Sequence, residues 1–474
     1  MLRASIEIAS RLSPTFGRIV REVWSTIGGS RFDDVKNHID TRLRELGGQT
    51  GSGTFALSIE ALNRGAGEQT GQPELAFITN LPPDDTGISC CSYHSWLGYT
   101  GKVDIFCPVS DADWFIRNSL ALNRNTSEGR LRILDVSSFL TASQINNYKY
   151  IVLSLGNPDH NIYLHALLNK ISAAGLSGRC YVYIHDPCIL NFIQKGLSLS
   201  SDQLIRYIEK NYPRKAAGIS AGKTVGRLHA DLAQRGILGL RYLREFGIRR
   251  FLVNSRAAER LVEVDLEGTG CRIGRLFHPV FLPEGVELPK HAPADRIGGP
   301  ELVVGTFGVP TSAKRVKEII EAARILHSDQ HKVRLIIAGY GVNKYIDRNP
   351  DFLRGLDVVY HDAPTDAELI NYMASVDVAV QLRSHNLGES SGVVAQLLML
   401  SRPVIVSAIG SFAEFGDAVI QTRPNASSAD IAAAILEAVR IPPRPEAISA
   451  YVNAHSPENF RRALMRQVEE MAAD

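Results

Sequence analysis

From residue 74 onward, the chain alternates short apolar runs with longer amphipathic stretches. The first series of apolar runs is ELAFITN, KVDIFCP, LRILDV, YKYIVLSLG, CYVYIHD and RRFLVNS. A second series begins at Leu302 with LVVGTFG and continues as VRLIIAGY, LDVVYHD, VDVAVQL, RPVIVSA and AVIQT. Continuous apolar runs predict strands buried on both faces, and the helices between them predict parallel pairing. The pattern therefore predicts an α/β protein with two separate, doubly wound parallel sheets of the Rossmann type.

The same pattern divides the chain into four segments. Residues 1–73 are expected to form an N-terminal helical extension, which ends in a linker rich in Gly, Gln and Thr. Residues 74–285 and 300–440 are the two predicted sheet domains, and 441–474 form a C-terminal helical segment. The stretch 282–300 is dense in Pro and Gly, as expected of a hinge. Because ligands of open parallel sheets bind beyond the carboxyl ends of the strands, two facing sheets predict a cleft for two substrates.

The overall composition excludes several classes of protein. The 474 residues carry a net charge of only +2, which gives no strong attraction to nucleic acid. No apolar run approaches the ~20 residues that a membrane span needs. The six cysteines show no C-x-x-C spacing, so neither a zinc site nor a disulfide framework is indicated. These features predict a cytoplasmic protein.

The first 28 residues combine four arginines with apolar residues at loosely helical spacing. Two interpretations stay open for this segment. It forms either a helix that packs on its own protein or on a partner subunit, as in a homo-oligomer, or a helix that lies on the inner face of the membrane.

The start of the second domain has the pattern of an anion site. LVVGTFG ends in Gly308 and is followed by VPTSAKRVKEIIEAARIL, which predicts a polar turn and then an amphipathic helix. A helix N-terminus offers unpaired N–H groups, and Lys314 and Arg315 stand beside it to neutralise a diphosphate. The ordinary alternative is that both residues are surface cations on a strand-to-helix turn.

A second polar turn follows the strand VDVAVQL in the segment LRSHNLGESSGVVAQ. Glu389 in this turn can accept hydrogen bonds from sugar hydroxyls and from backbone N–H groups. Gln396 lies seven residues later, two helical turns on and on the same face. The ordinary alternatives are a helix cap for Glu389 and a solvated polar residue for Gln396.

This stretch resembles the donor-binding motif of family 4 glycosyltransferases, which have the two-domain GT-B fold. In that family a Glu after the fourth strand of the C-terminal domain and a second acidic residue on the next helix precede small residues and Pro-Val-Ile. Glu389, Gln396 and Arg402-Pro403-Val404-Ile405 fall in that order. More narrowly, LR-x-x-x-x-GE-S-S and GSFAE are similar to a bacterial subgroup that builds cell-surface polysaccharides. The C-terminal AHSPENFRRALMRQVEEM resembles that family's last helix, which returns to the first domain.

The resemblance implies roles for individual residues. It assigns Glu389 to the transferred sugar and Gln396 to the nucleotide ribose, with Ser390 and Ser391 also in the donor site. Gln396 departs from the family's acidic residue, since an amide binds ribose hydroxyls more weakly than a carboxylate does. Val309 is a second departure, because many members place there an Arg that helps Lys314 hold the diphosphate. Arg315 and Arg383 are the two candidates to replace that Arg.

The first domain offers candidates at its own strand ends. ITNLPPDDTGIS resembles the family's opening loop, whose glycine, here Gly87, lets backbone approach the donor phosphates and the acceptor; a glycine that serves only a tight turn is the alternative. In similar enzymes the His after the later strand lies beside the transferred sugar, which assigns His185 to the reacting centre. The candidates on the acceptor side are Asn157, His160 and Asp186.

Family membership implies retention of anomeric configuration without a metal or other cofactor. The triplet Asp111-Ala112-Asp113 has the D-x-D form that holds a metal in the other large glycosyltransferase fold, but it is expected here to be only an acidic pair. The expected reaction moves a hexose, mannose as a first guess, from a GDP- or UDP-linked donor to a saccharide or lipid-linked acceptor. Two alternatives remain: a GT-B nucleotide-sugar epimerase, and an inactive GT-B scaffold in a polysaccharide assembly complex.

Overall fold

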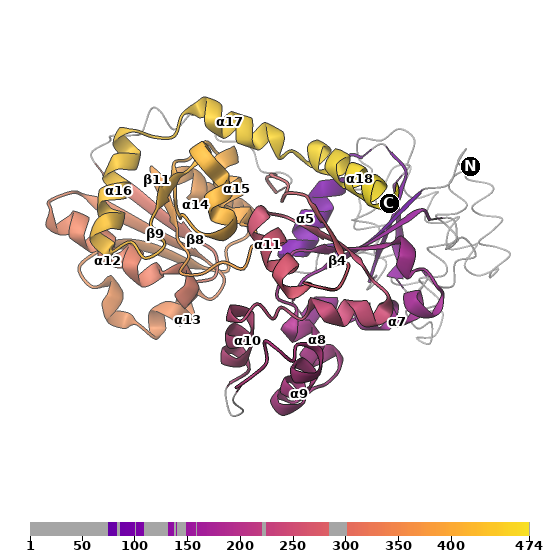
Figure 1. Cartoon of the computed structure of the whole chain (residues 1–474). Coiled ribbons are helices and arrows are strands. Elements are labelled where there is room, and N and C mark those ends of the chain that lie inside the picture. Colours follow the sequence, from indigo (N-terminus) through magenta and orange to yellow (C-terminus); the bar gives the residue numbers. More distant parts are fainter. Residues whose placement is uncertain are drawn as a thin grey trace, which may run out of the picture. The chain divides into compact units, whose positions relative to one another are not determined.

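The structure is a computed structural model, which describes residues 74–82, 86–99, 101–108, 131–136, 139, 148–157, 159–219, 224–283 and 301–473 (Figure 1). The predictions for residues 1–73, for most of the hinge and for the Asp111 to Asp113 triplet lie outside these residues. The described chain forms two compact units. One holds the residues up to Leu252, Asp265–Gly274 and the chain from Val468; the other holds Val253–Val264 and Arg275–Gln467.

The first unit is built on a seven-stranded sheet with the order β3-β2-β1-β4-β5-β6-β7. The strands are β1 (Leu75–Ile78), β2 (Val103–Cys107), β3 (Leu131–Asp135), β4 (Tyr150–Leu155), β5 (Cys180–Ile184), β6 (Arg250–Val253) and β7 (Arg272–Arg275). The helices along this part of the chain are α5 (Gly87–Trp96), α7 (Leu164–Ala173), α8 (Leu190–Gly196), α9 (Ser201–Asn211), α10 (Val225–Gln234) and α11 (Arg256–Asp265). Strands β1, β2 and β4 are wholly buried, as their apolar runs predict.

The second unit contains a six-stranded sheet with the order β10-β9-β8-β11-β12-β13, and all its pairings are parallel. The strands are β8 (Leu302–Phe307), β9 (Val333–Gly339), β10 (Asp357–Asp362), β11 (Val378–Gln381), β12 (Val404–Ser407) and β13 (Ile420–Thr422). Its helices are α12 (Val316–Ser328), α13 (Val342–Asp347), α14 (Asp366–Ser375), α15 (Gly392–Met399), α16 (Ser428–Arg440) and α17 (Pro445–Ala454). The strand order reverses between β8 and β11, which is where such sheets bind ligands.

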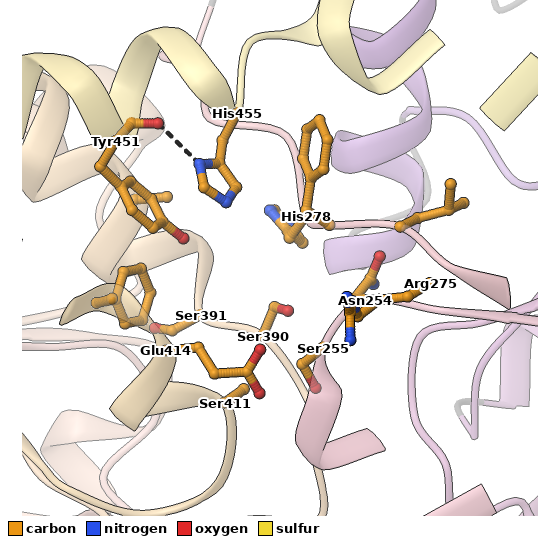
Figure 2. A pocket seen from close by; sticks show the side chains of 14 residues that line it. Asn254, Ser255, Arg275, His278, Ser390, Ser391, Ser411, Glu414, Tyr451 and His455 are labelled. Carbon is orange, nitrogen blue, oxygen red and sulfur yellow. Dashed lines mark hydrogen bonds between the residues drawn. The ribbon is translucent and has the colours of Figure 1, made fainter. Parts of the chain in front are cut away.

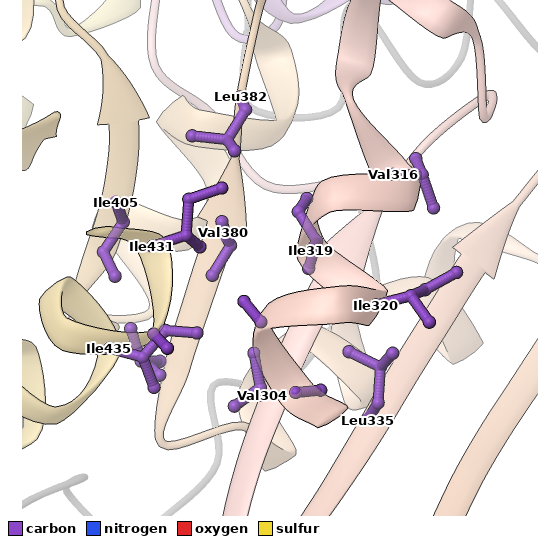
Figure 3. Packing of buried hydrophobic residues seen from close by; sticks show 14 of the residues in the cluster. Val304, Val316, Ile319, Ile320, Leu335, Val380, Leu382, Ile405, Ile431 and Ile435 are labelled. Carbon is purple, nitrogen blue, oxygen red and sulfur yellow. The ribbon is translucent and has the colours of Figure 1, made fainter. Parts of the chain in front are cut away.

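Two apolar layers cover this second sheet. On one face, α12 and α16 place Ile319, Ile320 and Ile435 against buried strand residues such as Val304 and Val380 (Figure 3). Residues 316, 319, 320, 323 and 326 of α12 are all buried, which is the 3.6-residue spacing of one helix face. The other face is covered by residues of α14, α15 and the 3-10 segment η9 (Gly410–Ala418). The predicted architecture of two parallel α/β sheets is therefore confirmed.

The end of the last helix, α18 (Pro457–Ala473), lies in the first unit. The Tyr181 hydroxyl donates to the carbonyl oxygen of Val468 at 2.8 Å. The guanidinium groups of Arg250 and Arg272 both donate to the carbonyl oxygen of Met471 at 3.0 Å. Across the described part of the chain, no helix combines the length and apolarity that membrane crossing demands.

Candidate active site

Two glycines shape the backbone at the carboxyl ends of β8 and β9. Gly308 has φ +88° and Gly339 has φ +156°. A Cβ on Gly339 would lie 2.5 Å from the backbone of Gly308, and a Cβ on Gly308 would lie 2.5 Å from Nζ of Lys314. Glycine at both positions therefore lets the two strand ends touch and lets the Lys314 ammonium lie directly against the backbone.

Lys314 and Arg383 bring two positive charges to this strand end. Nζ of Lys314 donates to the carbonyl oxygen of Phe307 at 3.4 Å. Burial and, to a smaller extent, the nearby Arg383 cation together lower the pKa of Lys314 to about 7. Burial also lowers the pKa of Arg383, while the negative charge of Glu389 raises it. Two neighbouring cations withdrawn from water are unfavourable by themselves, and a bound anion offsets this.

Arg383 is held in place by its own contacts. Its backbone N–H donates to Oγ of Ser407 at 3.0 Å, and its guanidinium lies over the Phe412 ring at 4.8 Å. One guanidinium N–H donates to the Leu382 carbonyl oxygen at 2.9 Å. Stacking on an aromatic face orients the planar guanidinium, and its other edge N–H groups can reach a ligand. Of the two candidates to replace the Arg missing at Val309, Arg383 is therefore the one beside Lys314.

The Arg315 side chain makes contacts within the second unit. Its backbone is left-handed, with φ +55°, and its side chain is only 8% exposed. The guanidinium donates to the carbonyl oxygens of Pro424 at 2.8 Å and Ala426 at 2.6 Å, and it also pairs with Glu318. These contacts join α12 to the loop before α16, and donor binding by Arg315 stays a prediction.

Glu389 lies in a loop that is fixed by hydrogen bonds. Its Oε2 accepts from the backbone N–H of Leu387 at 2.7 Å. Asn386 donates to the Glu389 carbonyl at 3.0 Å and accepts from the N–H groups of Gly388 and Ser411 at 2.9 and 3.0 Å. The Ser411 hydroxyl donates to the same Glu389 carbonyl at 2.5 Å. Since Ser391, and not Glu389, caps α15, the helix-cap alternative for Glu389 is wrong.

The loop is also anchored on its other side. Gly388 has φ +93°, and a Cβ there would lie 2.5 Å from the backbone of Ala258. The Ser255 hydroxyl donates to the Gly388 carbonyl at 2.9 Å. The carboxylate of Glu414 accepts from the N–H groups of Arg256 and Ala257, both at 2.9 Å, at the start of α11. Segment 254–258 thus packs tightly against the loop that carries Glu389.

Asn386 is a positioning residue that can be tested by mutation. Asn386→Ala removes the acceptor shared by Gly388 and Ser411, so the loop should sample other conformations. We expect turnover to fall about tenfold, with a much smaller change in nucleotide affinity, because the cations do not depend on this network. Steady-state kinetics that separate kcat from KM check this. Asn349→Ala, which alters an amide bonded to Tyr345 away from the loop, is the matched control.

Ser390, Ser391 and Gln396 follow Glu389 toward α15. Ser390 and Ser391 line a pocket of about 220 Å³, together with Ser411 and Glu414 (Figure 2). Gln396 is half-buried on α15 and is not among the residues that line this pocket. Its role toward a ribose stays a prediction.

In the first unit, the predicted residues gather at the ends of β4 and β5. Nε2 of His185 lies 2.9 Å from Oγ of Ser154 on the neighbouring strand, and the side chain is 9% exposed. Oδ2 of Asp186 accepts from the backbone N–H of Asn157 at 3.1 Å. Burial raises the pKa of Asp186, and this hydrogen bond lowers it. His185, Asp186 and Asn157 thus share one strand edge.

Asn157 and His160 also have structural partners. Oδ1 of Asn157 accepts from the N–H groups of Asn191 and Phe192 at 3.1 and 3.2 Å, at the beginning of α8. The His160 backbone carbonyl accepts from the Asn80 side chain at 3.2 Å, while the residue itself is exposed. The side chain of Asn157 therefore caps the start of α8, in addition to any contact that it makes with an acceptor substrate.

Gly87 is the first residue of α5, after the cap residue Thr86. Its φ is not positive, and a Cβ placed on it would meet no atom within 4 Å. The tight-turn alternative is therefore not supported. The open space beside its Cα is compatible with the close approach of a ligand.

Two residues that contact or form the Glu389 loop carry no signal that local sequence reasoning could assign, because Asn386 and Ser255 become partners only when the chain folds. Ser411 and Glu414 both belong to the GSFAE motif, which was noted as a motif but gave no residue role. Within the ranges that the structure covers, no three His, Cys, Asp or Glu side chains are grouped so that they could hold a metal.

Because Lys314 carries its charge in a partly buried position, we expect removal of this charge to stabilise the fold. The folded-state pKa of Lys314 is about 7, which lies below the ordinary 10.5. The free-energy cost of keeping the charged ammonium in the folded protein is therefore fully present below pH 7 and falls as the pH rises toward 10. Lys314→Met should raise stability by roughly 1 kcal/mol, about 2–4 °C in Tm, and most clearly at or below pH 7. Thermal unfolding measures this. Lys332→Met at an exposed position is the control, and an unchanged or lower Tm for Lys314→Met would contradict the prediction.

Comparison with known proteins agrees with this geometry. Residues 301–440 match the family described as Glycosyl transferases group 1. This range holds all six strands of the second sheet and helices α12 to α16. No curated protein matches the sequence.

Solved structures share the two-sheet fold at low sequence identity. HepE of Anabaena, in complex with UDP and glucose, is 14% identical, with a TM-score of 0.53 over 84% of this chain and 99% of that one. Sucrose-phosphate synthase from Thermosynechococcus elongatus is 12% identical, with a TM-score of 0.51 over 85% and 100%. A glycosyltransferase from Rickettsia africae is 10% identical, with a TM-score of 0.50 over 84% and 98%. The chain thus has the GT-B fold, and its second sheet is similar to the family described as Glycosyl transferases group 1.

Proposed function

We propose that this protein is a retaining, metal-independent glycosyltransferase. It moves a hexose from a nucleoside diphosphate sugar to a saccharide or lipid-linked saccharide, in the synthesis of a cell-surface polysaccharide. The observation that carries the proposal is the half-buried pair Lys314 and Arg383, placed beside Gly308 and Glu389 at the switch point of the second sheet.

The cation pair fits a diphosphate better than it fits a neutral ligand. Each phosphate of the donor carries negative charge, and α12 begins nearby at Val316 without a side-chain cap. Unpaired N–H groups at that helix start add to the positive potential. When the bond between sugar and diphosphate breaks, negative charge grows on the leaving oxygen. Preorganised cations in a dry site stabilise that charge more than they stabilise the bound donor, which lowers the barrier.

Glu389 is proposed to hold the transferred sugar. Its loop is fixed through Asn386 and Ser411, so the carboxylate is presented without further ordering. The acceptor hydroxyl forms a bond to the anomeric carbon on the face from which the diphosphate departs, and its proton passes to the leaving phosphate. His185 and Asp186 are the residues proposed to contact the sugar or the acceptor, on the basis of the family resemblance.

The donor is proposed to be UDP- or GDP-linked. HepE of Anabaena was solved with UDP and glucose, which makes UDP-glucose the first donor to test, with GDP-mannose beside it. A thermal-shift screen of the whole protein against nucleoside diphosphates and their sugars is the direct experiment, because a ligand of the native state raises Tm by mass action. A rise with one nucleotide class supports the proposal. No rise with any of them contradicts it and favours the scaffold, which the unusual Gln396 and Val309 already suggest.

Activity is then measured as release of the nucleoside diphosphate with and without saccharide acceptors. If the protein transfers the sugar, addition of an acceptor should increase the release of nucleoside diphosphate. Isomerisation of the donor sugar in the absence of an acceptor would instead identify an epimerase.

A further inference from the structure

The pocket of about 220 Å³ in the second unit is separate from the cation pair. It is lined by Asn254, Ser255, residues 275–278, Ser390, Ser391, Ala395, Ser411, Glu414, Phe415, Tyr451 and His455 (Figure 2). Neither Lys314 nor Arg383 is part of this lining. At ~30 Å³ per water molecule, the pocket has room for about seven waters, which places its ligand in the size class of a single monosaccharide.

Two histidines contribute hydrogen-bond acceptors to this pocket. Nδ1 of His455 lies 2.8 Å from the carbonyl oxygen of Tyr451, and Nδ1 of His278 lies 2.9 Å from that of Pro279. A carbonyl oxygen can only accept, so Nδ1 carries the proton in both rings and Nε2 is left as an acceptor. Figure 2 shows the second ring nitrogen of His455 directed toward the centre of the pocket. Burial lowers the pKa of both histidines, so both are neutral near pH 7.

Glu414 adds a third acceptor. Its two oxygens each accept one backbone N–H from the start of α11, which leaves further lone pairs for a ligand. The donors of the lining are the hydroxyls of Ser390 and Tyr451 and the Arg275 guanidinium, which is paired with Glu259. A ligand that matches this lining must both donate and accept several hydrogen bonds.

The charge of the lining selects among ligands. An anion would face the Glu414 carboxylate and two imidazole acceptors. Two histidines and a glutamate are also zinc-type ligands, but they do not come together as a metal cluster in the part of the chain that is described. A protonated amine would share the pocket with Arg275. A neutral polyhydroxylated molecule meets none of these conflicts, and its hydroxyls serve as donors and acceptors at once.

We propose that this pocket is a binding site for a neutral hexose, separate from the cation pair Lys314 and Arg383, although it shares Ser390 and Ser391 with the predicted donor site. The site does not depend on the glycosyltransferase proposal. An occupant would contact Ser390 and Ser411, and Ser411 also holds the carbonyl of Glu389. A bound hexose would therefore contact residues that fix the loop carrying Glu389.

The test is isothermal titration of the whole protein, without nucleotide, using D-glucose, D-mannose and D-galactose as neutral probes. Glucosamine and glucose 6-phosphate are the charged counterparts. We expect saturable binding of at least one neutral hexose in the millimolar range, and weaker binding of its charged counterparts. No saturable binding of the neutral hexoses, or tighter binding of a charged counterpart, overturns the proposal.

Variants locate the binding. Tyr451→Phe removes only a hydroxyl and His455→Phe removes the ring acceptor, and each should weaken hexose binding about tenfold, while His327→Phe on α12 should not. Wild-type affinity in both pocket variants, with Tm unchanged, overturns the assignment. Lys314→Ala should lose nucleotide binding and keep hexose binding, so this site and the proposed function can fail separately.

Discussion

Lys314→Ala should reduce nucleoside diphosphate release from the donor about 100-fold and weaken binding of the free nucleoside diphosphate. The ammonium lies against the strand end beside Gly308, where burial lowers its pKa to about 7. A cation already withdrawn from water needs no reorganisation when charge grows on the leaving group, and removal of one such group costs roughly 100-fold to 1,000-fold. Titration calorimetry and turnover assays measure the two effects.

The control for this variant is Lys332→Ala, which removes an exposed cation paired with Glu301. It should bind and turn over the donor like the wild type. Thermal unfolding of Lys314→Ala itself shows whether the variant is folded, so that a loss of activity can be separated from unfolding. Wild-type turnover in Lys314→Ala would show that the diphosphate does not bind at this end of the second sheet.

Glu389→Gln should lower kcat about 100-fold and change nucleoside diphosphate affinity by less than about threefold. The amide keeps an oxygen that can accept from the Leu387 N–H, so the loop should survive the change. What is lost is the negative charge, which makes hydrogen bonds to sugar hydroxyls about twice as strong as those of a neutral acceptor. The two quantities come from steady-state kinetics and from nucleotide titration of the same preparation.

Glu437→Gln, an exposed change on α16, is the matched control. If Glu389→Gln turned over normally, the carboxylate would have no part in catalysis. A large loss of nucleotide affinity would place Glu389 at the diphosphate and not at the sugar.

Most elements of the fold were accessible from the sequence because most strands are continuous apolar runs. Strand β7, with the sequence RIGR at the edge of the first sheet, is not such a run and was not predicted. Strands β8, β9 and β12 are buried almost throughout, and such runs have no other stable arrangement than a covered sheet. The position of Lys314 followed from the same logic, since a glycine at a strand end and a following helix form a recurrent anion site. Local pattern was sufficient for the strands and for the turn that carries Lys314, while anion binding at that turn stays a prediction.

The contacts between residues far apart in the sequence could not be predicted from the sequence. Arg315 adjoins Lys314 in sequence, but its guanidinium binds carbonyl oxygens more than 100 residues away, at Pro424 and Ala426. Nothing near residue 315 encodes those partners. Asn386 and Ser411 are 25 residues apart and meet only after β11 and β12 pair. Motif spacing identified Glu389, but the bonds that fix its loop required the fold.

Because the pKa of Lys314 is near neutral, binding of the donor should depend on the pH of the solution. In the proposed site, a bound diphosphate favours the ammonium form and raises that pKa again, so above about pH 7 each binding event takes up part of a proton. Release of the product returns the proton. Donor affinity would therefore be highest on the acid side of neutrality and decline in alkali, and the transfer cycle would include a proton exchange with the solvent that its overall stoichiometry does not reveal.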